Sequence, residues 1–294
     1  MKKGRNTIVH FVPRAPIRLS EILQEHFHLK DEERAVLFDL GAIYLGGERL
    51  RADSVIPKGA QLQIYLKPKR YKCLGVDWDQ RLIFENADFL ILDKPGGIPV
   101  HSTNDNLTEN VLYQLRSRWK KELLITHRLD APVSGLLLLA KNSDFQNFCN
   151  AKLAERELHK SYTALVEKAP PLGQQVHYLH PADRLPKQIS SEPKLQWLKC
   201  ELKIQRAQET KVLGARVNFQ VEIEPLTGRT HQIRAQMAGL GTPVLGDSLY
   251  GGKRLSAIPR LQIALCSVRL AWQGHGPKHS FELAADFKRE FGLG

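Results

Sequence analysis

Two apolar runs of the chain flank a short polar phrase that ends in a carboxylate. Residues 126–130 read Thr-His-Arg-Leu-Asp, and after an Ala-Pro-Val-Ser turn the apolar run 135–140 follows. A carboxylate at the edge of so much buried surface costs several kcal/mol unless it is paired or hydrogen-bonded. Asp130 therefore needs a cationic partner. Two interpretations are open: a structural ion pair with its neighbour Arg128, or a carboxylate placed for chemistry.

A second polar phrase stands where a strand gives way to a helix. Residues 227–234 read Thr-Gly-Arg-Thr-His-Gln-Ile-Arg and follow a predicted strand over Val217–Ile223. The backbone donors of such a helix start, together with Arg229, could hold an anionic group. Arg234 lies one helical turn beyond Thr230 and could face back toward a carboxylate. The alternative is a capped helix start with solvated arginines.

A tight Gly/Pro loop precedes both phrases, since residues 93–101 read Asp-Lys-Pro-Gly-Gly-Ile-Pro-Val-His. Alone, such a loop indicates only a turn. In this order, however, the loop, the His-Arg-Leu-Asp phrase with its Ser-Gly, and the Thr-Gly-Arg-Thr-His-Gln-Ile-Arg phrase resemble the motifs of RluA-type pseudouridine synthases. The residues over 243–247 (Pro-Val-Leu-Gly-Asp) and the pair Tyr250-Gly251 extend this resemblance, which covers roughly residues 80 to 270.

The resemblance implies an RNA pseudouridine synthase in which Asp130 is the catalytic nucleophile. It implies that Tyr162, in the phrase Lys-Ser-Tyr, stacks on the target base and that Arg234 pairs with Asp130. The substrate contacts that it further predicts come from Ile233, which would line the base pocket, Arg128, which would fill the gap left by the flipped nucleotide, and Lys94, Arg229 and His231.

The chemistry suits these residue types. Uridine isomerisation breaks the bond from ribose to the base nitrogen, turns the base and rejoins it through carbon, so we expect no cofactor and no metal. An ionised Asp130 could attack the ribose or the base, or stabilise positive charge on the sugar. Flipping the base out of the RNA stack costs a few kcal/mol, and the ring of Tyr162 could recover ~1 to 3 kcal/mol by stacking. The Tyr162 hydroxyl could also help to remove the proton from the carbon that becomes the new attachment point.

The chain departs from the family's pattern at two places. Val133 stands where the family commonly has Thr, which removes a hydroxyl beside the predicted active-site turn. Residues 265–267 read Leu-Cys-Ser in place of a more usual Leu-His-Ala. Neither change removes a predicted catalytic group.

The bulk composition favours a polyanionic partner. The 294 residues include 43 Lys and Arg against 31 Asp and Glu, which gives a formal net charge of +12. Each phosphate that a basic protein neutralises releases counterions, and this favours binding to nucleic acid. From charge alone, a solvated basic surface without such a partner is the alternative.

Other sequence features bear on the protein's surroundings. No apolar stretch reaches the ~18 to 20 residues needed to span a bilayer, and the basic residues 1–7 do not read as part of a signal peptide. The four cysteines lie far apart without a C-x-x-C pair, which argues against disulfides and zinc. We expect a cytoplasmic monomer that binds RNA, with no membrane and no obligatory protein partner.

The elements that must position these residues predict an α+β protein. From about residue 79, apolar strands, Gly/Pro turns and a few helices alternate without a regular βαβ repeat, which predicts a mixed, largely antiparallel sheet. Predicted strands are Phe89–Leu92, Leu136–Ala140, Tyr162–Val166, Val217–Ile223 and Leu261–Leu265, and predicted helices are Asn110–Arg118, Asp144–Glu155 and Thr230–Gly239. Several polar and Pro residues between Pro170 and Glu209 predict a variable insertion.

A small module precedes this region. Its predicted elements are a helix with apolar spacing over 17–23, a second helix over Asp31–Leu40 capped by Gly41, and strands over 42–45 and 61–66. Two helices followed by a hairpin resemble the S4-like RNA-binding module, although Gly46-Gly47 stands where Asn-Gly is usual. We expect the S4-like module over residues 1–70, a linker over 71–80 and the catalytic domain over 81–294.

Other functions remain open from the sequence. An RNA-binding or ribosome-associated protein on the same scaffold could have lost its chemistry, but the intact Asp130, Tyr162 and Arg234 favour the enzyme. Hydrolysis of a glycosidic bond usually needs two cooperating carboxylates, and no second acid stands out near the motifs. Both ribosomal and transfer RNA suit these motifs as a substrate, and the S4-like module favours ribosomal RNA.

Overall fold

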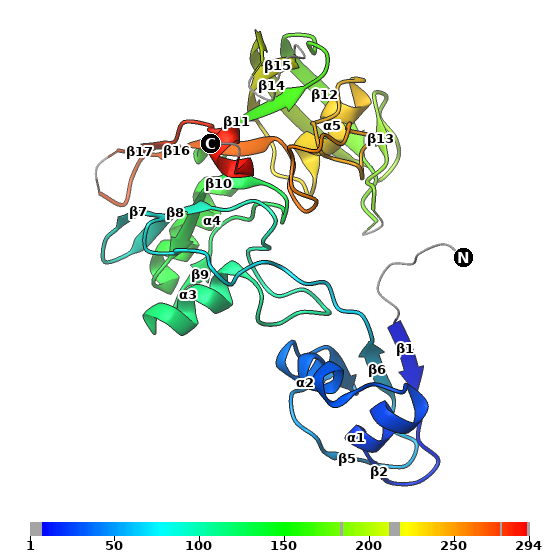
Figure 1. Ribbon diagram of the computed structural model, residues 1–294. Helices are drawn as coiled ribbons and strands as arrows, with labels where there is room; N and C mark the ends of the chain where they lie inside the picture. Colours follow the sequence, from blue (N-terminus) through cyan, green and yellow to red (C-terminus); the bar gives the residue numbers. More distant parts are fainter. Residues whose placement is uncertain (1–7, 183–184, 212–217, 277, 293–294) are drawn as a thin grey trace. The chain divides into compact units, whose positions relative to one another are not determined.

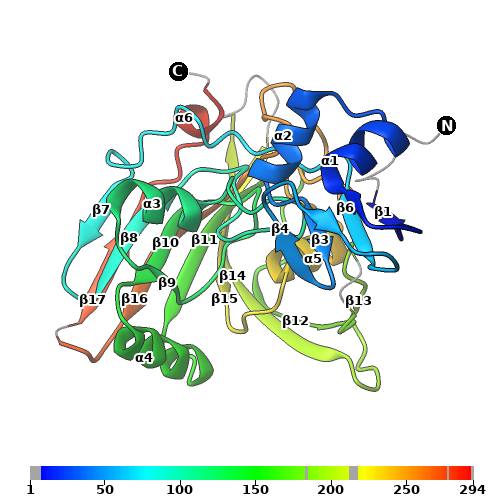
Figure 2. The ribbon, with the colours of Figure 1, turned by 90° about the horizontal axis from the view of Figure 1, so that it is seen from below.

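The chain folds into two compact units, and each is described by itself (Figures 1 and 2). The computed structural model describes residues 8–182, 185–211, 218–276 and 278–292. The N-terminal unit comprises Met1–Val76 and Pro99–Lys120, and the sheet unit comprises Asp77–Ile98 and Lys121–Gly294.

The sheet unit is built on one eleven-stranded sheet (Figures 1 and 2). Its strands are β7 (Leu82–Glu85), β8 (Phe89–Lys94), β9 (Leu124–Ile125), β10 (Ser134–Ala140), β11 (His159–Val166), β12 (Gly173–Leu179), β13 (Ile189–Ser190), β14 (Leu198–Thr210), β15 (Asn218–Pro225), β16 (Leu265–Trp272) and β17 (His279–Glu282). The order is β13-β12-β14-β15-β11-β16-β10-β8-β7, with β17 beside β16 and β9 beside β10. Only β10 and β16 run parallel among these described pairs, so the predicted α+β class with a largely antiparallel sheet is confirmed.

Strand β10 lies at the centre of the apolar core of the sheet unit. Every residue of β10 is buried, as its continuous apolar run predicts for a strand covered on both faces. Helix α4 (Ser143–Ala154) packs on β10 and begins where the Asn142 side chain accepts a hydrogen bond from the Phe145 backbone N–H. Phe145 then stacks on Phe89 of β8, with ring centroids 4.7 Å apart. This packing fixes the strand that directly follows the Asp130 turn.

Gly135 is required where β10 meets β16. Its φ is +101°, and a Cβ at this position would lie 2.2 Å from the backbone oxygen of Ser267. Any other residue would push the parallel pair Gly135–Ser267 apart. The Ser-Gly that follows the Asp130 turn therefore has a packing reason.

Most predicted elements of the sheet unit are present, with shifted bounds. The predicted helix Thr230–Gly239 is α5 (Gln232–Gly239), and the predicted strand Val217–Ile223 corresponds to β15, although Val217 lies outside the described residues. The sheet unit ends in α6 (Phe287–Phe291). The stretch between Pro170 and Glu209, expected to be a variable insertion, supplies β12, β13 and most of β14.

The predicted strand Leu261–Leu265 is wrong in its position. Hydrogen bonds from Ile258 N to Leu255 O and from Gln262 N to Pro259 O hold this stretch in turns, and Leu261 is 46% exposed. The strand begins only at Leu265, where β16 starts to pair with β11. The apolar run thus marks the approach to a strand.

The N-terminal unit has its own sheet and core. Its elements are β1 (Ile8–Phe11), β2 (Ile17–Arg18), α1 (Leu19–Glu21), the π-helical segment η1 (Ile22–His26), α2 (Asp31–Asp39), β3 (Ile43–Leu45), β4 (Glu48–Leu50), β5 (Val55–Ile56), β6 (Leu62–Tyr65) and α3 (Val111–Trp119). Four strands form the antiparallel sheet β1-β6-β3-β4. Buried Leu19, Ile22 and Leu37 pack against Ile43 and Ile64 of this sheet.

The predicted helix over 17–23 begins two residues late. Ile17 and Arg18 pair with β5 instead, and the helix starts at Leu19. The carboxylate of Asp53 accepts hydrogen bonds from the backbone N–H and the hydroxyl of Ser20, 33 residues earlier. A cap this distant in sequence leaves no local signal in the helix itself.

Residues 99–120 belong to the N-terminal unit, although the sequence-based division places them in the catalytic domain. Leu107 N donates to Leu40 O at 2.8 Å, and the Tyr44 hydroxyl donates to the backbone oxygen of Asn104 at 2.8 Å. Arg49 also donates to the backbone oxygen of Thr103 at 2.6 Å. These bonds to the loop before α3 were not signalled by composition or periodicity.

Candidate active site

The turn that carries Asp130 is anchored to β10 by two side chains. The Thr126 hydroxyl donates to the backbone oxygen of Leu138 at 2.7 Å, and Nε2 of His127 accepts from the Leu138 N–H at 3.1 Å. Burial lowers the pKa of His127 to about 3, so the ring stays neutral and can act as an acceptor. The polar phrase before Asp130 therefore fixes the turn.

The carboxylate of Asp130 meets a cation from the second sequence phrase. Arg234 Nη1 donates to Asp130 Oδ2 at 3.1 Å, across 104 residues of sequence, and His231 Nε2 lies 3.7 Å from the same oxygen. The Asp130 side chain is 25% exposed. In the described part of the chain both contacts fall on Oδ2, so Oδ1 is available to a ligand. The guanidinium beside Asp130 is that of Arg234.

A second carboxylate holds Arg234 from the other side. Arg234 Nε and Nη2 donate to the two carboxylate oxygens of Asp247, at 2.6 and 2.9 Å. The exposed fractions of these two side chains are 6% and 1%. Burial alone would lower the pKa of Arg234, but the hydrogen bonds and charge of Asp247, aided by Asp130, raise it. Arg234 is therefore a permanent cation of fixed orientation.

His231 occupies a strained backbone position at the start of α5. Its φ of +57° lies in the left-handed region, which is uncommon for a residue with a side chain. Its Nδ1 lies 3.1 Å from the Tyr250 hydroxyl, whose oxygen accepts from Lys187 N at 3.0 Å. Burial lowers the pKa of His231, and Asp130 only partly offsets this, so the ring is neutral near pH 7.

Tyr162 lies on β11, paired with Ile223 of β15 on one side and Ser267 of β16 on the other. It is buried, and burial raises the pKa of its phenol strongly. The negative charge of Asp130 raises the Tyr162 pKa further, so the two side chains lie close enough to interact. The phenol therefore stays protonated at physiological pH.

The loop that leads into α5 is held by Gln232. The Gln232 side-chain oxygen accepts from the Thr227 hydroxyl at 2.7 Å and from Arg229 N at 3.0 Å. Its amide group donates to the backbone oxygen of Glu201 on β14 at 2.9 Å. One buried amide thus fixes the loop that presents Arg229 and the helix that presents Arg234.

Lys94 is fully buried and surrounded by backbone oxygens. Its ammonium donates to the backbone oxygens of Pro95, Ile98 and Ala131, at 2.9, 2.7 and 3.2 Å. Burial lowers the pKa of Lys94 to about 7, although Glu290 and Asp130 oppose this shift. Three acceptors match the three ammonium protons, so Lys94 ties the Gly/Pro loop to the residue after Asp130.

The structure brings most predicted site residues to one region of the sheet unit. Asp130, His231 and Arg234 are in contact, and Tyr162 lies within range of the Asp130 charge. Ile233 is buried beside Arg234 on α5. The remaining two predicted contacts, Arg128 and Arg229, are exposed neighbours of this cluster in sequence.

The region that contains these residues matches a known protein family. Residues 88–239, just over half of the chain, match the family model described as RNA pseudouridylate synthase. The chain belongs to the RNA pseudouridylate synthase family. The predicted resemblance is thereby confirmed for the family, whose model includes the Asp130 turn, Tyr162 and Arg234.

Relatives of this chain are found in plants and bacteria. RNA pseudouridine synthase 6, chloroplastic, of Oryza sativa is 29% identical over 68% of this chain and 46% of its own length. Ribosomal large subunit pseudouridine synthase C of Buchnera aphidicola is 31% identical over 62% of this chain and 57% of its own length. The chain thus spans about half the length of these curated relatives.

A solved structure supports the fold of this chain. Human RNA Pseudouridylate Synthase Domain Containing 1 superposes with a TM-score of 0.57 at 22% sequence identity, covering 69% of this chain and 82% of that one. At this identity the likeness establishes the fold alone.

Sequence reasoning predicted no contact for two residues of this site, although both lie in the phrases that carry the resemblance. The first is Asp247, whose apolar surroundings (Pro-Val-Leu-Gly) are a signal for a buried carboxylate that needs a cation. The second is Tyr250, whose contact with His231 has no signal in spacing alone.

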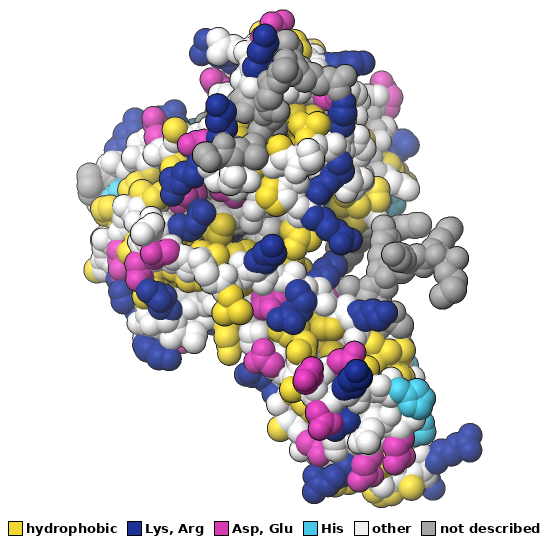
Figure 3. Space-filling model, in the orientation of Figure 1, with side chains coloured by type: hydrophobic (Ala, Val, Ile, Leu, Met, Phe, Trp, Pro, Cys, Tyr) yellow, Lys and Arg dark blue, Asp and Glu magenta, His cyan; other side chains and the backbone are white. Residues whose placement is uncertain are grey.

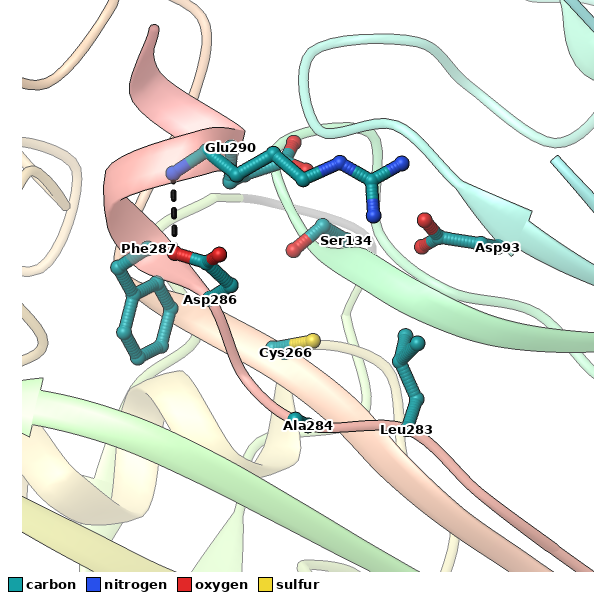
Figure 4. Close-up of a pocket in the computed structure, with 9 residues that line it drawn as sticks. Asp93, Ser134, Cys266, Leu283, Ala284, Asp286, Phe287 and Glu290 are labelled. Carbon is teal, nitrogen blue, oxygen red and sulfur yellow. Dashed lines mark hydrogen bonds between the residues drawn. The ribbon is translucent and has the colours of Figure 1, made fainter. Parts of the chain in front are cut away.

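A pocket lies elsewhere in the sheet unit, behind the Gly/Pro loop. Side chains of β8, β10 and β16 and of the C-terminal segment line it (Figure 4). Glu290 on α6 accepts a hydrogen bond from the Gly96 backbone N–H at 2.7 Å, so this segment supports the loop that Lys94 holds. None of the predicted site residues lines this pocket, which separates it from the synthase site.

No group of three or more His, Cys, Asp or Glu side chains among the described residues could hold a metal ion. No helix in the described part of the chain is long and apolar enough to cross a membrane.

Proposed function

We propose that this chain is an RNA pseudouridine synthase in which Asp130 is the nucleophile. The observation that carries the proposal is the pairing of Asp130 with Arg234, which joins the two sequence phrases into one site. Arg234 engages only Oδ2 of a carboxylate that is 25% exposed, so Oδ1 can reach a substrate. The buried, positively charged Arg234 fixes the orientation of the Asp130 carboxylate through the bond to Oδ2.

In the proposed reaction, the bond between ribose and the base nitrogen breaks with assistance from Asp130. The detached uracil turns within the site and rejoins the ribose through carbon. The proton on that carbon is then lost, and the ring nitrogen that left the ribose takes up a proton. No atom is gained or lost overall, and no electron acceptor is needed. Asp130 acts either by covalent attack or by stabilising positive charge on the sugar.

Tyr162 acts in this proposal as a ring and a hydrogen-bond donor. Because burial and the nearby Asp130 raise the pKa of its phenol, removal of a substrate proton by a Tyr162 phenolate is disfavoured. Its ring is suited to stack on a uracil that has been flipped out of the RNA, which offsets part of the unstacking cost. Stacking therefore becomes its main proposed role.

The other substrate contacts are assigned by position. Ile233, buried on α5 beside Arg234, is proposed to line the base pocket, and His231, whose Nε2 lies 3.7 Å from Asp130 Oδ2, to contact the substrate beside Asp130. The exposed Arg128 and Arg229 are proposed to contact RNA. Lys94 has no exposed surface, and its three backbone acceptors support a positioning role beneath Asp130 in place of substrate contact.

We propose ribosomal RNA as the substrate in preference to transfer RNA. A relative from Buchnera aphidicola is named as a ribosomal large subunit pseudouridine synthase. The net charge of +12 suits a large polyanion, and Figure 3 shows Lys and Arg side chains spread over the face of the sheet unit in view.

The organisation of the whole chain remains a proposal. We keep the S4-like module over residues 1–70, the linker over 71–80 and the catalytic domain over 81–294. In the N-terminal unit, Asp31, Glu32 and Glu33 occupy the first turn of α2, so this turn repels phosphate. Any RNA contact of the module must use another surface. We also infer a monomer, and a reducing compartment such as the cytoplasm because the four buried cysteines form no disulfide among the described residues.

The deciding test is pseudouridine mapping of total RNA from cells with the gene, without it, and with an Asp130→Asn copy restored. We expect one or a few sites to disappear without the gene and to return only with the unaltered copy. This outcome would also name the RNA.

An unchanged map in all three strains, with the protein shown to be expressed, would contradict the proposal. It would favour a catalytically silent RNA-binding or ribosome-associated protein on the same scaffold. Release of free uracil would instead indicate hydrolysis of the glycosidic bond.

A further inference from the structure

Lys160 lies on β11, two residues before Tyr162, beneath the loop that leads into α5. A Cβ added at Gly228 would stand 3.8 Å from the Lys160 ammonium, so the ammonium lies directly below that loop. The imidazole of His127 is also near, since the charge of Lys160 contributes to lowering the pKa of that ring. Lys160 thus connects the Asp130 turn with the Arg229 loop.

The ammonium of Lys160 has no counter-ion among the described residues. Lys160 is partly buried, and desolvation lowers its pKa with no opposing contribution from a carboxylate. Arg234 differs, because Asp247 and Asp130 match its charge, and Lys94 differs, because three backbone oxygens accept its protons. A cation withdrawn from water without a partner is unfavourable in the free protein. An anionic ligand would remove this cost.

A second donor without an acceptor lies near Lys160. Nε2 of His127 accepts from the Leu138 N–H, so the neutral ring carries its proton on Nδ1. Nδ1 finds no hydrogen-bond partner among the described residues, although His127 is only 7% exposed. Two unsatisfied donors in one corner of the site are independent indications of a missing acceptor.

Gly228 leaves room for that acceptor. Its backbone is not in the left-handed region that favours glycine. Among the described residues other than its two chain neighbours, only Nζ of Lys160 lies within 4 Å of an added Cβ. Neither backbone strain nor packing therefore requires a glycine here. Its effect is to leave the space above the ammonium open, next to the exposed Arg229 in sequence.

We propose that Lys160 binds a phosphodiester group of the RNA backbone next to the flipped uridine. A phosphate oxygen accepts several hydrogen bonds and carries the charge that the Lys160 ammonium lacks. Because Lys160 is two residues from Tyr162, this contact would set the position of the flipped nucleotide on the stacking ring. Lys160 is therefore a positioning residue, and the inference rests on the proposed function.

The test uses the full chain and an RNA that the unaltered protein modifies. For Lys160→Gln we expect the Kd to rise about tenfold, and the slope of log Kd against log salt to fall by about 0.7 to 0.9, the value for one phosphate contact. The turnover of saturated enzyme should fall by a smaller factor than the affinity. Lys168→Gln, which removes an exposed lysine beyond the other end of β11, is the matched control and should leave both quantities unchanged.

A second measurement replaces the phosphates around the target uridine, one at a time, by uncharged methylphosphonate. One replacement should weaken binding to the unaltered protein about tenfold and have almost no effect on Lys160→Gln, because the contact is already absent. Additive losses at every position would overturn the proposal. The cycle also separates lost contact from poor folding, since a misfolded variant would lose affinity for every RNA alike.

The two levels of inference fail differently. If the unaltered protein forms pseudouridine and Lys160→Gln keeps its Kd and salt slope, the role of Lys160 is wrong and the synthase proposal stands. If the unaltered protein modifies no RNA, the synthase proposal fails and the role of Lys160 fails with it.

Discussion

The two carboxylates that flank Arg234 share one guanidinium but differ in their surroundings. Asp247 is 1% exposed and accepts from Nε and Nη2 with both of its oxygens. Asp130 is 25% exposed and accepts from Nη1 with Oδ2 alone. A carboxylate whose oxygens are both engaged and buried can neither attack a substrate nor activate water. The loop of Asp247 therefore supports the site, and the turn of Asp130 can react.

This comparison also bears on hydrolysis of a glycosidic bond. A second acid does lie beside the site, which the sequence did not indicate, but it is Asp247 and faces away from solvent. Two carboxylates that cooperate on a glycosidic bond must both reach the substrate or its water. With only Asp130 accessible on Arg234, the geometry favours isomerisation.

The largest effect is expected for Asp130→Asn, which tests whether Asp130 is the reactive carboxylate of the two. We expect pseudouridine formation to fall by about a thousandfold or more, as when other nucleophiles are removed. The free energy of unfolding should change by only about 1 to 2 kcal/mol, because Arg234 keeps both bonds to Asp247. Single-turnover assays and urea unfolding measure the two effects. Full activity of the variant would exclude Asp130 as the nucleophile.

The corresponding substitution of the buried carboxylate, Asp247→Asn, should act mainly on stability. It removes the buried negative charge of Asp247 that pairs with Arg234, and breaking a buried pair typically costs about 3 to 5 kcal/mol of stability. Urea unfolding of the two asparagine variants, measured side by side, gives the comparison with a built-in control. If both variants lose equal stability, the distinction between a supporting and a reactive carboxylate fails.

Tyr162→Phe tests the role of the Tyr162 hydroxyl beside Asp130. We expect turnover to fall about tenfold through loss of one hydrogen bond in the transition state, with the RNA Kd unchanged because the stacking ring remains. Since the raised pKa keeps the phenol protonated, the pH–rate profiles of both proteins should have the same shape from pH 7 to 10. A limb present only in the unaltered protein would show that Tyr162 acts as a base.

The sequence predicted the chemical groups of the site better than their partners. Asp130 was noted as a carboxylate between apolar runs and Arg234 as a cation at a helix start, and the family resemblance gave both their predicted roles. The cage of backbone oxygens around Lys94 and the fixation of the α5 loop by Gln232 depend on how distant segments meet. The local sequence carries no signal for such long-range hydrogen bonds.

The fold shows the same division. Strand β10 was predicted because a continuous apolar run is a local signal, and helix α4 was predicted within one residue at each end. The start of β16 and the grouping of residues 99–120 with the N-terminal unit were not, since pairing with β11 and hydrogen bonds to Leu40 and Arg49 decide them. Local patterns therefore identify elements, and long-range contacts set their limits.

The smallest predicted effect concerns the anchor of the reactive turn. Burial lowers the pKa of His127 to about 3, well below the ~6.5 of an unfolded histidine. Between these values the unfolded chain binds a proton that the folded chain does not, so stability present above pH ~6.5 is lost as the pH falls toward 3. The slope from this group is at most about 1.4 kcal/mol per pH unit.

His127→Gln tests this anchor, because a glutamine oxygen can still accept from the Leu138 N–H but does not titrate. In urea unfolding between pH 6 and 4, the slope of the free energy of unfolding against pH should be smaller by the contribution of about one bound proton. His231, whose pKa is also lowered by burial, remains and keeps part of the slope. An unchanged slope would mean that His127 is protonated in the folded chain. The Asp130 turn would then be held by Thr126 without the His127 acceptor.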